Sequence, residues 1–132
     1  MSEQANADLI RNLYAAFRRG DIPQVMSFLD PRADLNFEGP ATIPWTGARH
    51  GHEGWVSFFQ TIGESLEDIT LSMELFAAQG DNVAAAGRYQ GRVRKTGNHI
   101  DSPLVHLWTI RNGLVVHCQE MTNTAAEAAA CS

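Results

Sequence analysis

The side chains best suited to acid–base chemistry gather in the last third of the sequence. His106 stands in an otherwise apolar row at alternate positions, with Leu104 before it and Trp108 after it. A histidine in such a row can act as a general base or acid near neutral pH, because its unperturbed pKa is about 6.5. Two carboxylates in the same region, Asp101 and Glu120, could pair with it. We therefore take His106, Asp101 and Glu120 as candidate catalytic residues.

Each candidate also has a structural interpretation. His106 could be a core histidine that is hydrogen-bonded to a neighbouring strand, and Asp101 could be a solvated strand residue. Arg88 and Tyr89 lie in an adjacent strand, and one of the two must face inward because strand side chains alternate. An inward Arg88 needs a carboxylate partner such as Glu120 or Asp101, since an unpaired buried charge is costly. Such a pair could anchor an anionic substrate, whereas an outward Arg88 would lie in solvent or in an interface.

Three consecutive strands must position these residues. We predict them at Val83–Lys95, His99–Arg111 and Leu114–Asn123. Asn and Gly stand in both connections, and this pair between β-rich runs is a strong hairpin signal. The even residues from Ile100 to Ile110 share one face of the middle strand, and the odd residues share the other. Either face could line a cavity.

The segments before these strands have mostly helical periodicity. We predict helices at about Asn6–Arg19, after Asp21, and at about His52–Leu66, strands at Ala33–Glu38 and Ile69–Gln79, and a loop at Gly39–Gly51. Helices that come before a meander indicate an α+β domain, in which the helices cover one face of an antiparallel sheet. A cavity between helices and sheet is then expected, and the polar residues that point into it would decide function.

Length, charge and composition exclude several classes of protein. The 132 residues are expected to form a single domain, 1–132, and the net charge of −5 argues against a nucleic-acid partner. No apolar stretch is long enough to span a membrane, and the polar start lacks a signal-peptide core. Cys118 and Cys131 do not make a disulfide framework. We expect a cytoplasmic protein that binds neither nucleic acid nor membrane.

Three segments carry a resemblance to a known family. They are Tyr14–Asp21, the run from Ile43 through Gly54 with Phe58-Phe59, and Val105–Ala125. In these segments the chain resembles the SnoaL-like (polyketide cyclase-like) proteins of the nuclear-transport-factor-2-like superfamily, which are related to ketosteroid isomerases and limonene-epoxide hydrolases. The resemblance implies a cone-shaped, barrel-like fold with three helices packed on a strongly curved, mostly antiparallel sheet. It also implies a deep apolar pocket at the open end.

The resemblance leaves the reaction open. Alignment at Gly20-Asp21 places the catalytic base of ketosteroid isomerases on Phe37, and their first-helix tyrosine on Leu13, one residue before Tyr14. Steroid-isomerase chemistry by the known residues is therefore not expected. The resemblance also implies an acid–base aspartate near the end of the final strands, as in SnoaL-type cyclases. Many relatives have Asp where this chain has Asn123, which can orient a ligand but cannot take its proton.

The remaining pocket candidates are mostly aromatic. We expect the ligand pocket to include Tyr14, Trp45, Phe59, Arg88, Trp108 and Asn123. Trp45 either faces the ligand at the mouth of the pocket or packs between helices. His50 and His52 have no recognisable third ligand, so we expect no metal site, and we expect no cofactor.

Two classes of function fit these residues. The first is a cofactor-free isomerase, cyclase or hydrolase-like enzyme that acts on a small apolar carbonyl or polyketide-like compound by general acid–base catalysis. The second is a non-catalytic ligand-binding or protein-interaction module. In either case the expected ligand is a small hydrophobic molecule. Val105 and Leu107 lie opposite Leu104 and Trp108, so both faces of the sheet are apolar, which predicts a homodimer through the outer face.

Overall fold

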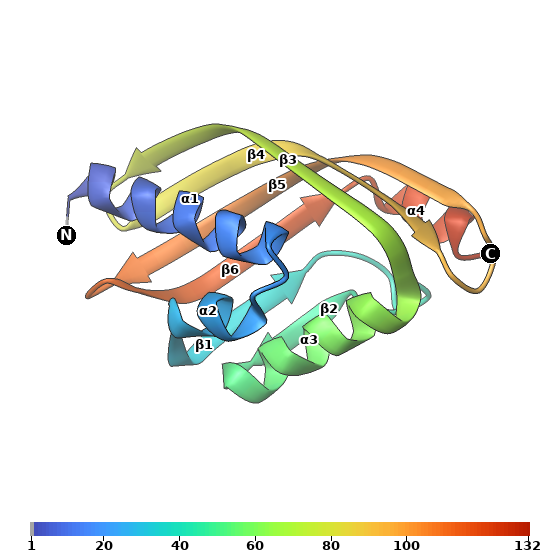
Figure 1. Cartoon of the computed structure of the whole chain (residues 1–132), viewed down its shortest axis with the longest axis horizontal. Helices are drawn as coiled ribbons and strands as arrows, with labels where there is room; N and C mark the ends of the chain where they lie inside the picture. The colour runs from blue at the N-terminus through green and yellow to red at the C-terminus, as the bar shows by residue number, and fades with distance from the viewer. Residues whose placement is uncertain (1) are drawn as a thin grey trace.

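The computed structural model describes residues 2–132 and contains two helices, two strands, a third helix, a run of four strands and a final short helix (Figure 1). Their bounds are α1 Glu3–Arg18, α2 Ile22–Ser27, β1 Leu29–Phe37, β2 Gly47–His50, α3 Gly51–Ser65, β3 Leu66–Gln79, β4 Asn82–Val93, β5 His99–Arg111, β6 Leu114–Thr122 and α4 Thr124–Ala130. Among these described residues, no helix is both long enough and apolar enough to cross a membrane.

The six strands form one open, strongly curved sheet in the order β2-β1-β6-β5-β4-β3 (Figure 1). The pair of β1 with β6 is parallel and the other neighbouring pairs are antiparallel. Helices α1, α2 and α3 lie on the concave face, where the amphipathic α1 buries a stripe that includes Leu9, Leu13 and Tyr14. The predicted α+β class and the mostly antiparallel sheet are confirmed.

The structure differs from the predicted elements at three places. Helix α4 is absent from the predicted elements, because its alanine-rich sequence has little apolar periodicity. The Asn123 side chain caps the start of this helix by accepting a hydrogen bond from the Ala126 N–H at 3.1 Å. Strand β2 lies inside the predicted loop. Strand β1 begins earlier than predicted and includes Pro31, which lies between Leu29 and Asp34 where the ladder with β6 is interrupted, so no strand hydrogen bond is lost.

An extra residue in β6 decides which of its side chains face inward. The pairing of β6 with β5 shifts by one residue at Val116. This β-bulge resets the alternation of side chains, so that Val115 and Cys118 are both fully buried although they are three residues apart. Glu120 follows Cys118 on the same inward face.

The convex face of the sheet carries two apolar rows that run across the strands. The first row is Leu75, Ala86, Val105 and Met121, and the second is Ala77, Ala84 and Leu107. Leu75 and Leu107 are 63% and 45% exposed, respectively. This face is therefore an apolar surface without a covering element in the described chain.

Candidate functional site

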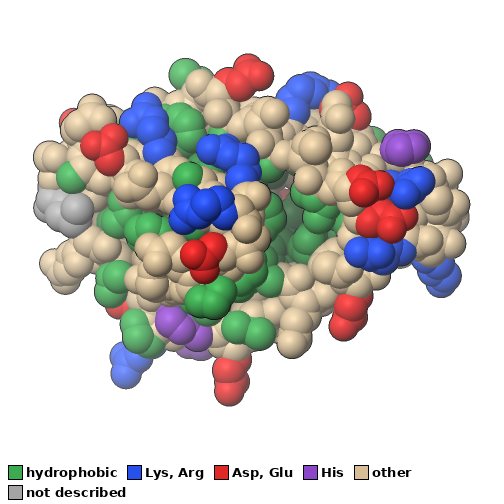
Figure 2. All heavy atoms as spheres, in the orientation of Figure 1, with side chains coloured by type: hydrophobic (Ala, Val, Ile, Leu, Met, Phe, Trp, Pro, Cys, Tyr) green, Lys and Arg blue, Asp and Glu red, His purple; other side chains and the backbone are tan. Residues whose placement is uncertain are grey.

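A cavity of about 100 Å³ lies between the helices and the concave face of the sheet. Figure 2 shows a hollow at the centre of the molecule with hydrophobic side chains inside it. Its aromatic walls are formed by Tyr14, Phe17, Phe37, Trp45, Trp55, Phe58, Phe59, Tyr89 and Trp108. Such a lining favours a flat apolar ligand, whose orientation a small number of polar atoms would have to fix.

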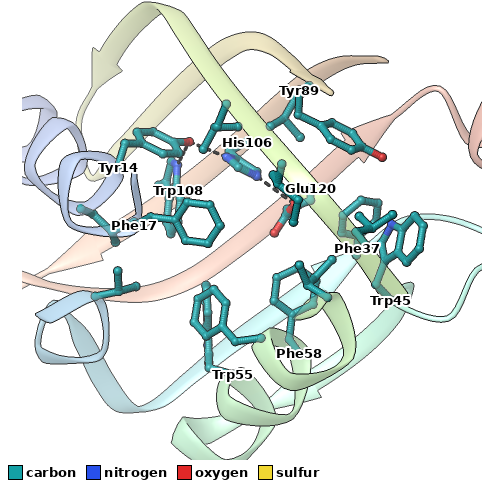
Figure 3. A pocket seen from close by; sticks show the side chains of 18 residues that line it. Tyr14, Phe17, Phe37, Trp45, Trp55, Phe58, Tyr89, His106, Trp108 and Glu120 are labelled. Atoms are coloured by element: carbon teal, nitrogen blue, oxygen red, sulfur yellow. Dashed lines mark hydrogen bonds and ion pairs between the residues drawn. The ribbon is translucent and has the colours of Figure 1, made fainter. Parts of the chain in front are cut away.

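The first group of polar atoms is a chain of side chains from α1, β5 and β6 (Figure 3). The Trp108 indole N–H donates a hydrogen bond to the Tyr14 hydroxyl oxygen at 2.9 Å. The Tyr14 hydroxyl is in turn hydrogen-bonded to Nδ1 of His106. On the other side of the ring, Nε2 of His106 lies 2.9 Å from a carboxylate oxygen of Glu120. All four residues line the cavity and are buried.

Strand pairing and helix packing bring this group together. His106 and Glu120 are direct cross-strand partners in β5 and β6. Trp108 shares the inward face with His106, since the two are two positions apart in one strand. Tyr14 reaches them from the buried stripe of α1, and its ring stacks on the His106 ring with a centroid distance of 5.6 Å.

The Nε2 atom of His106 is buried and has no hydrogen-bond partner among the described residues. Its 2.9 Å contact with Glu120 is close, but the angles at this contact are not those of a hydrogen bond. A buried polar atom without a partner is costly in a core and common at a functional site. We therefore treat His106 and Glu120 as one histidine–carboxylate pair that lines the cavity.

Burial sets the protonation of the neighbouring groups. It raises the pKa of the Tyr14 phenol well above its ordinary value; the nearby Glu120 adds to this effect, and the hydrogen bond from Trp108 opposes it. Tyr14 therefore keeps its proton near neutral pH and can donate it in a hydrogen bond. Burial also raises the pKa of the Cys118 thiol, so Cys118 is not an activated nucleophile.

A second polar group lies around Glu127 in α4, whose side chain is fully buried. Its carboxylate accepts hydrogen bonds from the Tyr89 hydroxyl, from the Thr122 hydroxyl at 2.5 Å and from the Trp45 indole N–H at 3.3 Å. Burial raises the pKa of Glu127, and these three donors partly offset the effect. Burial and the nearby Glu127 likewise raise the pKa of Tyr89.

Six of the predicted site residues surround the cavity. They are Tyr14, Trp45, Phe59, His106, Trp108 and Glu120. The structure thus brings His106 and Glu120 together with Tyr14, and it selects the even face of β5 as the inward one. Their assignment to catalysis or ligand binding stays a prediction.

Three predicted residues lie elsewhere, and the expectation that they line the cavity is wrong. Asp101 belongs to the outward face of β5, and Arg88 belongs to the outward face of β4. The two pair with each other at 3.1 Å, and each side chain is more than half exposed. Asn123 lies just after the end of β6, where it is exposed and caps α4. Of the two residues in β4 that could face inward, it is Tyr89 that does so.

Sequence reasoning missed Glu127 and gave Tyr89 no site role. Alternation in β4 was a usable signal for Tyr89, since an inward tyrosine needs no charged partner. Glu127 had no such signal, because a single acid among alanines near the end of a chain is typical of a solvated segment.

Among the described residues, one group could supply donors to a metal ion. The ligand atoms of His106, Cys118 and Glu120 lie within 4.8 Å of one another. His106 and Glu120 touch each other directly, so an ion would have to separate them. His50 is instead hydrogen-bonded to Asp34, and Nε2 of His52 lies 3.0 Å from the Leu29 carbonyl oxygen. The expected absence of a metal stays a prediction.

Comparison with known families and structures gives a consistent picture. The sequence matches the family model described as the SnoaL-like domain over residues 10–118. No curated protein matches the sequence.

Several solved structures share the fold over nearly their whole length. An NTF2-like protein from Burkholderia xenovorans LB400 is 28% identical, with a TM-score of 0.89 and coverage of 100% of this chain and 99% of that one. TerC, which was co-crystallised with polyporic acid, is 25% identical, with a TM-score of 0.85 and coverage of 96% and 98%. A candidate SnoaL-like polyketide cyclase from Jannaschia sp. CCS1 is 22% identical, with a TM-score of 0.84 and coverage of 98% and 93%. The last similarity bears on the fold alone.

Proposed function

The chain belongs to the SnoaL-like family of NTF2-like proteins, and from that premise we propose that it is a cofactor-free isomerase, cyclase or hydrolase-like enzyme. Its substrate would be a small apolar carbonyl or polyketide-like compound. One observation supports the proposal above all. An apolar cavity is lined by a buried His106, whose Nδ1 is hydrogen-bonded to Tyr14 and whose Nε2 lies 2.9 Å from a carboxylate oxygen of Glu120.

The roles of the three residues follow from their contacts. We assign the His106 tautomer in which the Nδ1–H donates to the Tyr14 oxygen, and the Trp108 N–H donates to the same oxygen. The Tyr14 O–H is then free to donate to a substrate carbonyl oxygen. His106 and Glu120 together exchange one proton with the substrate carbon next to that carbonyl.

The reaction step needs nothing beyond these groups. The His106–Glu120 pair takes a proton from the carbon next to the carbonyl, and the electron pair of the broken C–H bond moves into an enolate. Tyr14 stabilises the enolate oxygen through its hydrogen bond, and the apolar walls strengthen this interaction by excluding water. In a β,γ-unsaturated ketone the enolate is conjugated with the carbon–carbon double bond, and return of the proton to the γ carbon completes an isomerisation. TerC, a structural relative, was co-crystallised with polyporic acid, which supports a small-molecule ligand for this cavity.

The test measures proton exchange on a simple ketone. We expect the protein to accelerate deuterium incorporation next to the carbonyl of 2-tetralone in D₂O, followed by proton NMR. His106→Ala should lower the rate by roughly 10²- to 10⁴-fold, which is the usual contribution of a general acid–base group. His99→Ala is the matched control, because His99 is an exposed histidine of the same strand, and its rate should not change.

A different result would favour the non-catalytic alternative. If wild-type protein binds 2-tetralone but exchanges its protons no faster than His106→Ala, the enzyme proposal fails and a ligand-binding module is favoured. Unfolding curves of both variants show whether a lost rate reflects a lost fold.

Two further proposals concern the surroundings of the protein. The apolar rows on the convex face of the sheet, with Leu75 and Leu107 exposed, support a homodimer through that face. The free thiols of Cys118 and Cys131 support a reducing location such as the cytoplasm.

A further inference from the structure

A second group of polar side chains borders the cavity, and the proposed acid–base chemistry does not use it. Tyr89 lines the cavity and is 7% exposed. Its hydroxyl lies near the end of the cavity formed by Trp45 and Phe37, apart from the group of Tyr14, His106 and Glu120 (Figure 3). A ligand that reaches both groups would therefore need a polar atom at each of two separate positions.

When Glu127 is ionised, the hydrogen-bond direction at Tyr89 is fixed. Its O–H donates to the carboxylate of Glu127, which has no proton to spare for Tyr89 when ionised. The Tyr89 oxygen can therefore offer only its lone pairs to a ligand. Because the chain of hydrogen bonds ends on a carboxylate, these lone pairs are a stronger acceptor than those of an ordinary phenol.

The acceptor is also held in place. Glu127 is fully buried, and besides Tyr89 it accepts hydrogen bonds from Trp45 at 3.3 Å and Thr122 at 2.5 Å. These donors come from three different parts of the chain, so the carboxylate cannot rotate without breaking several bonds. Tyr89 is therefore preorganised to accept one hydrogen bond from the cavity.

We propose that Tyr89, backed by Glu127, is a second binding subsite that takes an enol or phenol hydroxyl of the ligand. The inference rests on the proposed use of this cavity for a carbonyl compound and makes its ligand bifunctional. A carbonyl or its enol form meets Tyr14 and His106, and a hydroxyl donor meets Tyr89.

Other groups fit this subsite less well. A carbonyl or ether oxygen would set its lone pairs against those of Tyr89. An ammonium group has three donors to satisfy, and Tyr89 offers it one acceptor among apolar walls. A neutral hydroxyl matches both the direction and the number of hydrogen bonds.

The test compares two probes that differ by one hydroxyl group, 2,6-dihydroxynaphthalene and 2-naphthol. Binding is followed by fluorescence, since Trp45, Trp55 and Trp108 all line the cavity. Wild-type protein should bind the diol about tenfold more tightly, as one hydrogen bond to a charge-backed acceptor allows. Tyr89→Phe should abolish this preference while still binding 2-naphthol.

Thr122→Val is the matched control. It removes another donor to Glu127 without touching the cavity, because Thr122 is not among the lining residues. The diol preference should persist in this variant and vanish in Tyr89→Phe. The inference is overturned if wild-type protein binds both probes equally or binds neither at millimolar concentration. It is also overturned if Tyr89→Phe keeps the preference or Thr122→Val loses it.

The outcome is independent of catalysis. His106→Ala tests the acid–base proposal through deuterium exchange, and this variant should keep the diol preference. A protein that shows the preference without exchange would reject the enzyme proposal and leave the subsite standing.

Discussion

Replacing Glu127 should be among the most damaging single changes outside the proposed acid–base group. Glu127→Ala leaves the donors of Trp45, Tyr89 and Thr122 without their acceptor. Trp45 and Tyr89 are 1% and 7% exposed, so water cannot readily replace the carboxylate. Each of these two orphaned buried donors costs about 1 to 2 kcal/mol, and loss of the buried Cγ methylene adds about 1 kcal/mol. We expect the free energy of unfolding to fall by roughly 3 to 5 kcal/mol.

Glu127→Gln separates hydrogen bonding from charge. The amide oxygen can accept from Tyr89 and Trp45, and the amide nitrogen can donate to the Thr122 hydroxyl, so all three partners keep a bond. Its unfolding free energy at neutral pH should stay within about 1 kcal/mol of the wild type. Urea unfolding followed by tryptophan fluorescence measures both variants, and Glu64→Ala, at an exposed site in α3, is the control.

The same pair of proteins should differ in pH dependence. Burial raises the pKa of Glu127 in the folded state above its value in the unfolded chain, so the folded state holds this proton more tightly. The resulting stability is fully present below the unfolded pKa, about 4.3, and is lost as the pH rises through the folded pKa. The unfolding free energy of wild type minus that of Glu127→Gln should therefore fall as the pH rises from 4, and then level off. A difference that is flat or rises with pH, or a Glu127→Ala variant as stable as Glu64→Ala, would refute this reasoning.

Two further predictions concern the strands. A Cβ at Gly87 would lie 1.9 Å from the Ser72 carbonyl oxygen, so Gly87→Ala should lower the unfolding free energy by about 2 kcal/mol or more. Gly63→Ala in α3 is the control: a Cβ there meets nothing within 4 Å, so this change should raise the unfolding free energy slightly. Equal effects of the two changes in thermal unfolding would contradict the packing argument. If the convex face forms a homodimer, Leu107→Glu should give monomers in sedimentation experiments. Val56→Glu is the control, because Val56 lies in helix α3 and is 41% exposed, and this variant should remain a dimer. A monomeric wild type would reject the dimer.

Much of the fold could be predicted, because apolar residues recur at the helical period in α1 and at every second residue in β5. The apolar stripe of α1 and the alternation in β5 each follow from one element's own sequence. That is why His106 and Trp108 could be assigned to a shared face before the structure was known. The choice between the two faces needed the helices, whose packing no single segment encodes.

The rest of the site depends on contacts between distant segments. Tyr14 meets His106 across 92 positions of sequence, and its place depends on how α1 crosses the sheet. Glu127 lies in a helix with almost no hydrophobic periodicity, so its burial follows from the loop and strands that cover it. Alternation of side chains along β6 could not place Glu120 on the inward face, because the β-bulge at Val116 interrupts that alternation.

The bulge at Val116 has a consequence for how such proteins diversify. On a regular strand, Val115 and Glu120 would lie on opposite faces, and it is one additional residue that turns Glu120 toward the cavity. Loss or gain of a single codon at this point would exchange the inward and outward sets of side chains over the end of β6. A lineage with this fold could therefore acquire or discard a carboxylate next to its histidine without any substitution in the cavity. Relatives with the same residue types would then carry different chemistry.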